Sequence, residues 1–266
     1  NSTRSFQPAR FAHDKHRFQT TWAIFWAAFL VRVLYITLAH TYRIRVDEDH
    51  FHFGYEMGRI ARALATGYGY ADPFHGHTGP TTWVAPLYPL LLAAVFKVFG
   101  VYTVRSGWVI LTIDSFFSAL TTLTTYEIAA RCFNRRVAIW SAWIWALYPA
   151  AMQYAVRWVW EMPLSTWLFT CILVLALRMR RIEETPDDDS SRLQDSRTLP
   201  RWLLFGFLWG LLALSNPSLL LFLPAAGLWI LRDPRNRHRQ WRWVASSAAI
   251  FLLCIAPWVI RNTVAF

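Results

Sequence analysis

Long apolar blocks separated by short polar loops dominate this chain of 266 residues. Residues 22–40 form an almost unbroken apolar stretch, long enough to cross the roughly 30 Å hydrocarbon core of a bilayer. Further blocks lie at 84–100, 106–130, 137–156, 162–177, 202–216, 218–231 and 243–260. Only 16% of the residues are charged, whereas soluble globular domains carry about 25%. We therefore expect an all-α polytopic membrane protein.

Basic residues between the blocks predict which side of the membrane each loop faces. Positively charged loops stay in the cytoplasm. Arginines cluster at 131–136, 178–181 and 232–242, and the N-terminal tail 1–21 is also basic. These four regions can share the inner side only if one of the blocks 84–100 and 106–130 does not cross the membrane.

Block 84–100 is the one that we expect not to cross. It is short, Pro86 and Pro89 stand at its start, and Lys97 lies near its end, before Gly100. We predict an interfacial or re-entrant helix on the outer face.

About seven transmembrane helices then remain, in a single module that covers residues 1–266. The tail 1–21 and the charged linker 178–201 are cytoplasmic, and residues 41–105 form a long outer loop. Because the net charge of +11 lies mostly in short cytoplasmic loops, it indicates membrane orientation rather than nucleic-acid binding. The cysteines lie in or beside apolar blocks and are expected to serve packing; they are Cys132, Cys171 and Cys254.

The outer loop should contain an amphipathic helix that rests on lipid. Its apolar face would hold Phe53, Met57, Ile60, Ala61 and Leu64, and its polar face His52, Glu56, Arg59 and Arg62. Gly67 and Gly69 would end it.

An acidic run, Asp47-Glu48-Asp49, directly follows the first apolar block. Carboxylates beside a membrane surface are strongly hydrated and anchor poorly to lipid. They suit a metal ion, a cationic partner or a proton to be abstracted.

Histidines near this run suggest a divalent metal. Two His-x-His pairs occur in the outer loop, at 50–52 and 75–77. Glu48, Asp49 and His50 are candidate ligands of Mg²⁺ or Mn²⁺, although such spacing also occurs in loops without metal.

Two ionisable residues fall near the middle of the membrane. Arg32 lies about ten residues into the first span and Asp114 about nine into the second, counted from opposite faces, so each is roughly 14–15 Å deep. We expect a buried ion pair. A transporter would also place charges there, and this is one alternative function.

Five passages occur in an order that resembles one family. The first is the pair Asp47-Glu48, and the second is residues 59–70, an alanine-rich helix that ends in Gly-x-Gly. The third is residues 81–92, whose helix continues to Phe99-Gly100. The last two are Glu161 and residues 257–262, Pro-Trp-Val-Ile-Arg-Asn. Together they resemble the GT-C superfamily of membrane glycosyltransferases, in the branch of protein O-mannosyltransferases and lipid A aminoarabinose transferases. The resemblance covers nearly the whole chain and implies a seven-span module, without the variable C-terminal spans typical of the family.

The resemblance implies transfer of a sugar from a polyprenyl-phosphate carrier to an acceptor at the outer face of the bacterial plasma membrane. The configuration of the anomeric carbon is inverted in this transfer. The acceptor is a lipid, a glycan or a protein. Its hydroxyl must lose a proton, so a carboxylate is needed as base. Asp47 is the first choice. Asp49 is the alternative, because the stretch from Asp47 to Gly67 is longer than the family pattern. Glu161 would lie opposite this base, across the active site.

The departing lipid phosphate needs a cation. Arg157 and Arg261 stand at outer span ends, where a guanidinium can bind phosphate bidentately, and Arg105 and Lys97 are further candidates; interfacial snorkelling is the other explanation. A non-catalytic fragment or subunit that binds the polyprenyl-phosphate sugar is the second alternative function.

Overall fold

The computed structural model describes residues 9–45, 50–180, 182, 198–232 and 240–266. Within them the only regular elements are helices, and Ala71 and Pro80 form an isolated bridge. The helices are α1 (Ala9–Leu38), α3 (Tyr55–Thr66), α4 (Leu87–Phe99), α5 (Val104–Cys132), α6 (Arg135–Leu147), α7 (Pro149–Val156), α8 (Met162–Met179), α10 (Thr198–Ala213), the 3₁₀ helix η1 (Pro217–Leu221), α11 (Phe222–Leu231) and α12 (Gln240–Ala265). The all-α class is confirmed for these residues. The expected linker 178–201 falls largely outside them.

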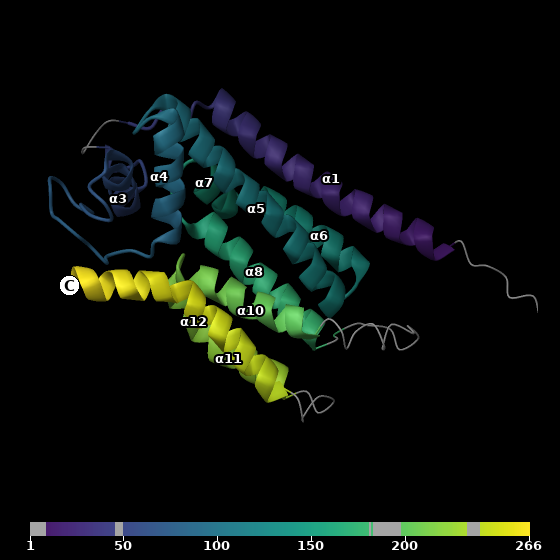
Figure 1. Ribbon diagram of the computed structural model, residues 1–266. Helices are drawn as coiled ribbons and strands as arrows, with labels where there is room; N and C mark the ends of the chain where they lie inside the picture. Colours follow the sequence, from purple (N-terminus) through teal and green to yellow (C-terminus); the bar gives the residue numbers. More distant parts are fainter. Residues whose placement is uncertain (1–8, 46–49, 181, 183–197, 233–239) are drawn as a thin grey trace, which may run out of the picture.

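The helices form a bundle with a cap at one end (Figure 1). In the bundle α5 packs on α1, α6 and α8, and α10 packs on α8 and α12. We define the cap as residues 50–103, which hold α3, α4 and their connecting loops. In it α4 packs on both α3 and α5, so α4 lies between α3 and the bundle.

Four helices are long and apolar enough to cross a membrane. They are Thr21–Leu38, Val104–Cys132, Met162–Met179 and Trp241–Ala265. The chain is therefore a membrane protein of the all-α class. Leu199–Ala213 and Pro217–Leu231 are shorter, and the predicted block 137–156 is divided between α6 and α7. The count of seven spans stays a prediction.

Helix α4 agrees with the expectation for block 84–100. Its 13 residues would extend about 20 Å, well short of the roughly 30 Å hydrocarbon core. Figure 1 shows it lying across the direction of the bundle helices. Tyr88, Leu92 and Phe96 are buried inside the protein.

Helix α3 confirms the predicted amphipathic helix from Tyr55 onward and its end, whereas His52 and Phe53, predicted on its two faces, lie in the turn before it. Gly67 adopts a left-handed φ of 93°, and its N–H donates to the carbonyl of Ala63. The predicted polar face is wrong at Arg59, which is buried, with its guanidinium 4.9 Å from the ring centre of Phe51. The helix was expected to rest on lipid, but it packs on α4. The cap folds back onto the bundle and so provides this protein surface.

The expected ion pair between Arg32 and Asp114 is not formed. The guanidinium of Arg32 donates to the carbonyls of Ala28 at 3.0 Å and Ala146 at 2.8 Å, and more weakly to that of Trp145 at 3.5 Å. The usual helical partner of the Trp145 carbonyl would be the N–H of residue 149, which is a proline without one. Arg32 therefore serves the carbonyls at the break between α6 and α7, where the helix dipole also favours a cation.

Asp114 has a different partner. Its Oδ2 accepts a 2.7 Å hydrogen bond from the hydroxyl of Tyr88, and both residues are fully buried. Asp114 thus fastens α4 of the cap to α5 of the bundle. The central charge pair that motivated the transporter alternative is absent.

A double-mutant cycle with Arg32→Met and Asp114→Asn will test these separate roles. Arg32→Met should lower the free energy of unfolding by about 1–3 kcal/mol, because two buried carbonyls lose a donor. The coupling energy between the two substitutions should stay below about 0.5 kcal/mol, since the side chains share no partner. Thermal unfolding in detergent measures both values. A coupling energy of about 2 kcal/mol or more would instead support a direct ion pair between Arg32 and Asp114.

Candidate functional site

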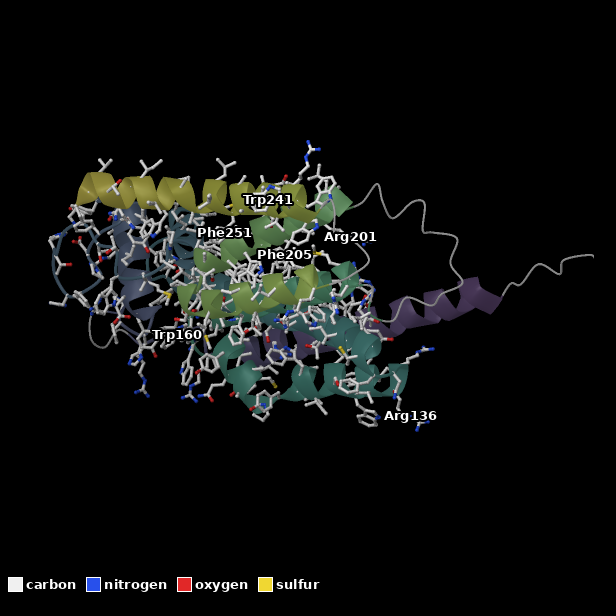
Figure 2. The ribbon with its side chains drawn as sticks, turned by 90° about the horizontal axis from the view of Figure 1, so that it is seen from below. Arg136, Trp160, Arg201, Phe205, Trp241 and Phe251 are labelled. Carbon is white, nitrogen blue, oxygen red and sulfur yellow. The ribbon has the colours of Figure 1, made fainter. Side chains whose placement is uncertain are left out.

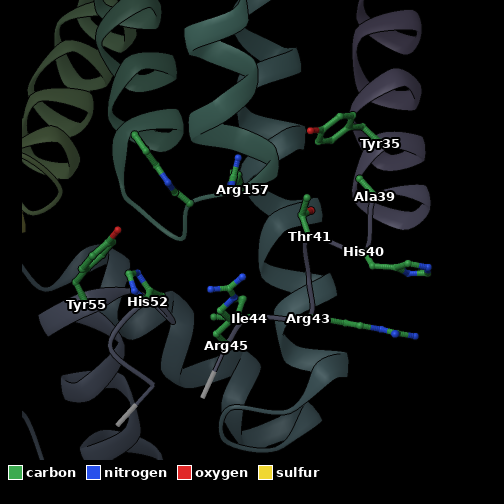
Figure 3. Close-up of a pocket in the computed structure, with 11 residues that line it drawn as sticks. Tyr35, Ala39, His40, Thr41, Arg43, Ile44, Arg45, His52, Tyr55 and Arg157 are labelled. Atoms are coloured by element: carbon green, nitrogen blue, oxygen red, sulfur yellow. The ribbon is translucent and has the colours of Figure 1, made fainter. Parts of the chain in front are cut away.

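An open pocket of about 660 Å³ lies between the end of α1, the start of α3 and the loop that joins α7 to α8. Figure 3 shows the Arg45 guanidinium near the middle of this space, with His52 and Tyr55 on one side and Arg157 on another. Arg43 also lines it, as do Tyr35 and His40. We call it the cationic pocket, because the described residues that line it include three arginines and no carboxylate.

If Thr21–Leu38 spans the bilayer, the cationic pocket lies at the level of the lipid headgroups. Helix α1 ends at Leu38, and the residues that follow it, from Ala39 to Arg45, form one wall. Tyr35, one turn inside the span, also lines it. Arg43, Arg45 and Arg157 are all exposed, so an anion at the membrane surface can reach their guanidinium groups.

The predicted catalytic carboxylates Asp47 and Asp49 lie outside the described residues, as does Glu48. In the sequence they stand between Arg45 and His52, which both line the cationic pocket. The neighbouring His50 is described, and its ring stacks on Tyr102 with the ring centres 4.5 Å apart.

The predicted metal site cannot be assembled from the described residues alone. They contain no group of three histidine, cysteine or acidic side chains placed to hold an ion. Glu48 and Asp49 lie outside them, and His77 of the second histidine pair is bound to Asp72 at 3.0 Å. The Mg²⁺ or Mn²⁺ site of Glu48, Asp49 and His50 stays a prediction.

Glu161 is placed beside the cationic pocket but is buried. Glu161 directly precedes the first turn of α8, and the residue is 8% exposed. Its Oε2 atom is buried without a hydrogen-bond partner. Oε1 accepts a long 3.5 Å hydrogen bond from Asn216. The adjacent Trp160 packs on Tyr55, which lines the cationic pocket. Glu161 thus follows directly on a residue that packs against the wall of the pocket.

Burial raises the pKa of the Glu161 carboxyl to about 7. At neutral pH this group therefore exists in both protonation states, which favours exchange of a proton with a neighbouring group. Nearby, the Tyr88–Asp114 hydrogen bond adds a further acidic group to the same interior, and the charge of Glu161 acts on Tyr88.

Of the predicted phosphate-binding residues, the structure brings only Arg157 to the cationic pocket. Lys97 and Arg105 are exposed but do not line it. Arg261 donates to the backbone carbonyls of Tyr70 at 2.7 Å and Thr81 at 2.6 Å, and so holds a loop of the cap. Sequence reasoning did not assign Arg43 and Arg45 to the phosphate. Their position between the first span and the acidic run was the available signal.

Comparison with protein-family models, with curated proteins and with solved structures finds no match to this chain. The function must therefore be argued from the cationic pocket, from Glu161 and from the order of the sequence motifs.

The raised pKa of Glu161 predicts how folding stability depends on pH. An unfolded chain ionises this carboxyl near pH 4.5, but the folded chain does so only near pH 7. Between these values the folded state holds more protons, so the free energy of unfolding should fall as pH rises, by a total of about 3 kcal/mol. Below 4.5 and above 7 this contribution is constant.

Chemical unfolding in detergent at a series of pH values will measure this slope. Glu161→Gln keeps the shape of the side chain and removes the titration, so the slope between pH 4.5 and 7 should flatten. An equal slope in both proteins would assign the pH dependence to another group.

Proposed function

We propose that this chain is an integral-membrane glycosyltransferase that moves a sugar from a polyprenyl-phosphate carrier to an acceptor at the outer face of the membrane. The cationic pocket is the observation that carries the proposal. A lipid carrier must present its phosphate at the headgroup layer, and Arg43, Arg45 and Arg157 surround a space at that level. Guanidinium groups bind phosphate oxygens bidentately.

The reaction places two demands on the protein. The acceptor hydroxyl attacks the anomeric carbon, and the bond from that carbon to the phosphate oxygen breaks. The bonding electron pair goes to the phosphate, whose added negative charge the arginines of the cationic pocket stabilise. The hydroxyl proton goes to a carboxylate. A single displacement of this kind inverts the anomeric carbon.

Asp47 is the proposed base, with Asp49 as the alternative in the same run. Both follow Arg45 within four residues, so the base and the phosphate-binding groups belong to one short stretch of chain. Glu161 contributes a second carboxyl behind Trp160. Its pKa of about 7 suits it to exchange protons at neutral pH.

The distribution of charge supports an outward-facing cationic pocket. Figure 2 shows Arg136 and Arg201 toward one end of the bundle, and Trp160 lies toward the other. If the arginine-rich end is cytoplasmic, the cap and the cationic pocket face outward. We propose a multi-pass protein of the bacterial plasma membrane with a cytoplasmic N-terminus. Its seven spans would be the four long helices, the α6–α7 pair, α10, and η1 with α11.

Arg157→Ala tests the binding part of the proposal. It should weaken binding of a labelled polyprenyl-phosphate sugar by about tenfold or more, since a charge-assisted contact of this kind is worth about 1.5–3 kcal/mol. The matched control is Arg136→Ala, an exposed arginine at the opposite end of the bundle, which should bind as the parent does. Equal affinities in all three proteins would remove the cationic pocket from donor binding.

Asp47→Asn tests the chemical part. It removes the proton acceptor while keeping the shape, so turnover should fall by about 10²–10⁴-fold with donor binding unchanged. Release of labelled sugar to an acceptor measures turnover. Normal transfer by this variant would move the base to Asp49, and normal transfer by the double variant with Asp49→Asn would end the proposal of a base in this run. Donor binding without any transfer by the parent protein would identify a binding subunit.

A further inference from the structure

A second pocket of about 340 Å³ lies in the cap, between the C-terminal part of α3 and the loop that follows it. Arg62, Tyr68, Asp72, His75 and His77 line it. None of these residues belongs to the proposed catalytic groups. Its volume falls within the roughly 300–1,000 Å³ typical of small-ligand sites. We call it the loop pocket.

The loop pocket is built around the carboxylate of Asp72. Its Oδ1 accepts the backbone N–H groups of Thr78 and Gly79, both at 2.9 Å, and its Oδ2 contacts Nδ1 of His77 at 3.0 Å. Asp72 itself has a left-handed φ of 57°, a conformation that aspartate adopts more readily than most residues. The side chain is almost fully buried.

Arg261 closes the base of this loop from the last helix of the bundle. Its two Nη atoms donate to the carbonyls of Tyr70 and Thr81, at the two ends of the loop. Its guanidinium also lies over the rings of Tyr70 and Trp258. The loop is thus ordered before any ligand arrives, and a preformed site loses less entropy on binding.

The protonation states follow from these contacts. Burial acts to raise the pKa of Asp72, but hydrogen bonds from His77, Gly79 and Thr78 hold it below its usual value, so the carboxylate is ionised at neutral pH. A carboxylate only accepts hydrogen bonds, so Nδ1 of His77 must be the donor. The side chain of His77 is 71% exposed, so the ring edge that carries Nε2 is open to a ligand.

Exposed aromatic rings accompany these polar groups. Tyr68 is 64% exposed, and its ring packs on that of His77 with the centres 4.9 Å apart. Phe74 and Trp83, also exposed, form a second ring pair beside the same loop. A flat aromatic face next to hydrogen-bonding groups suits an amphipathic ring, whose C–H face is apolar and whose edge is polar.

We propose that the loop pocket binds a saccharide. Hydroxyl groups both donate and accept, so they can pair with Nε2 of His77 in either of its protonation states and with the guanidinium of Arg62, which only donates. An anion only accepts, and so could use the guanidinium of Arg62 but not the phenol ring faces that accompany it. A membrane anchor would be a convex apolar patch rather than a pocket with an ionised wall.

The position of the loop pocket suggests the size of the saccharide. Tyr55, at the start of α3, lines the cationic pocket, and Thr66, at its end, lines the loop pocket. Eleven residues of helix separate them, about 16 Å. A saccharide held in the loop pocket can reach the cationic pocket only as a chain of several sugar units. It would be the acceptor glycan, an assignment that rests on the proposed function; the binding itself does not.

Saturation-transfer NMR with the purified protein and three soluble probes, cellotriose, maltotriose and chitotriose, will test the inference without any donor. At least one trisaccharide should bind at millimolar concentration. Tyr68→Ala and His77→Ala should each weaken that binding by about tenfold or more. The matched control Trp140→Ala, an equally exposed aromatic of α6, should leave it unchanged.

Two results would overturn the inference. One is the absence of binding for all three probes. The other is binding that persists in both Tyr68→Ala and His77→Ala. The binding measurement uses neither donor nor transfer, so failure of sugar transfer and failure of the loop pocket give different results.

Discussion

A single buried hydrogen bond fixes where the cap meets the bundle. The hydroxyl of Tyr88 in α4 donates to Asp114 in α5 where no water reaches either group. A carboxylate placed inside a helix bundle is costly without a donor, so α4 must lie where Tyr88 can reach it. The N–H of Leu87, bonded to the carbonyl of Leu214, fastens the start of α4 to the other side of the bundle. Helix α3 packs on α4, and both pockets take their positions from α3.

The two pockets use opposite ends of α3 and different chemistry. The cationic pocket is bordered by bundle residues such as Arg157 and by the chain that leaves α1. The loop pocket depends on Asp72 and on the clamp from Arg261. A lipid that enters from the membrane and a polar chain that arrives from outside would therefore approach from different sides.

Local patterns predicted local features well and long-range partners poorly. Pro86, Pro89 and the length of the block predicted a helix too short to cross, in agreement with the 13 residues of α4, and periodicity with Gly67 predicted α3. The partners of Arg32 were missed because they arise from a helix break created by Pro149, far along the chain. The role of Arg261 was missed for the same reason, since its partner Thr81 lies 180 residues away. Glu161 was found by its place in a motif, but its burial depends on packing that no sequence pattern expresses.

The contact between Arg32 and the break at Pro149 also sets an order for biosynthesis. Arg32 enters the membrane with α1, but the carbonyl of Ala146 that receives it is synthesised 114 residues later. Until then the guanidinium has only the Ala28 carbonyl of its own helix. The first helix should therefore remain beside the insertion machinery or in a hydrated position until α6 and α7 arrive. The same guanidinium therefore stabilises the folded protein and destabilises the incomplete chain in the membrane. A chain released before α7 is synthesised would keep this cation without its second carbonyl partner.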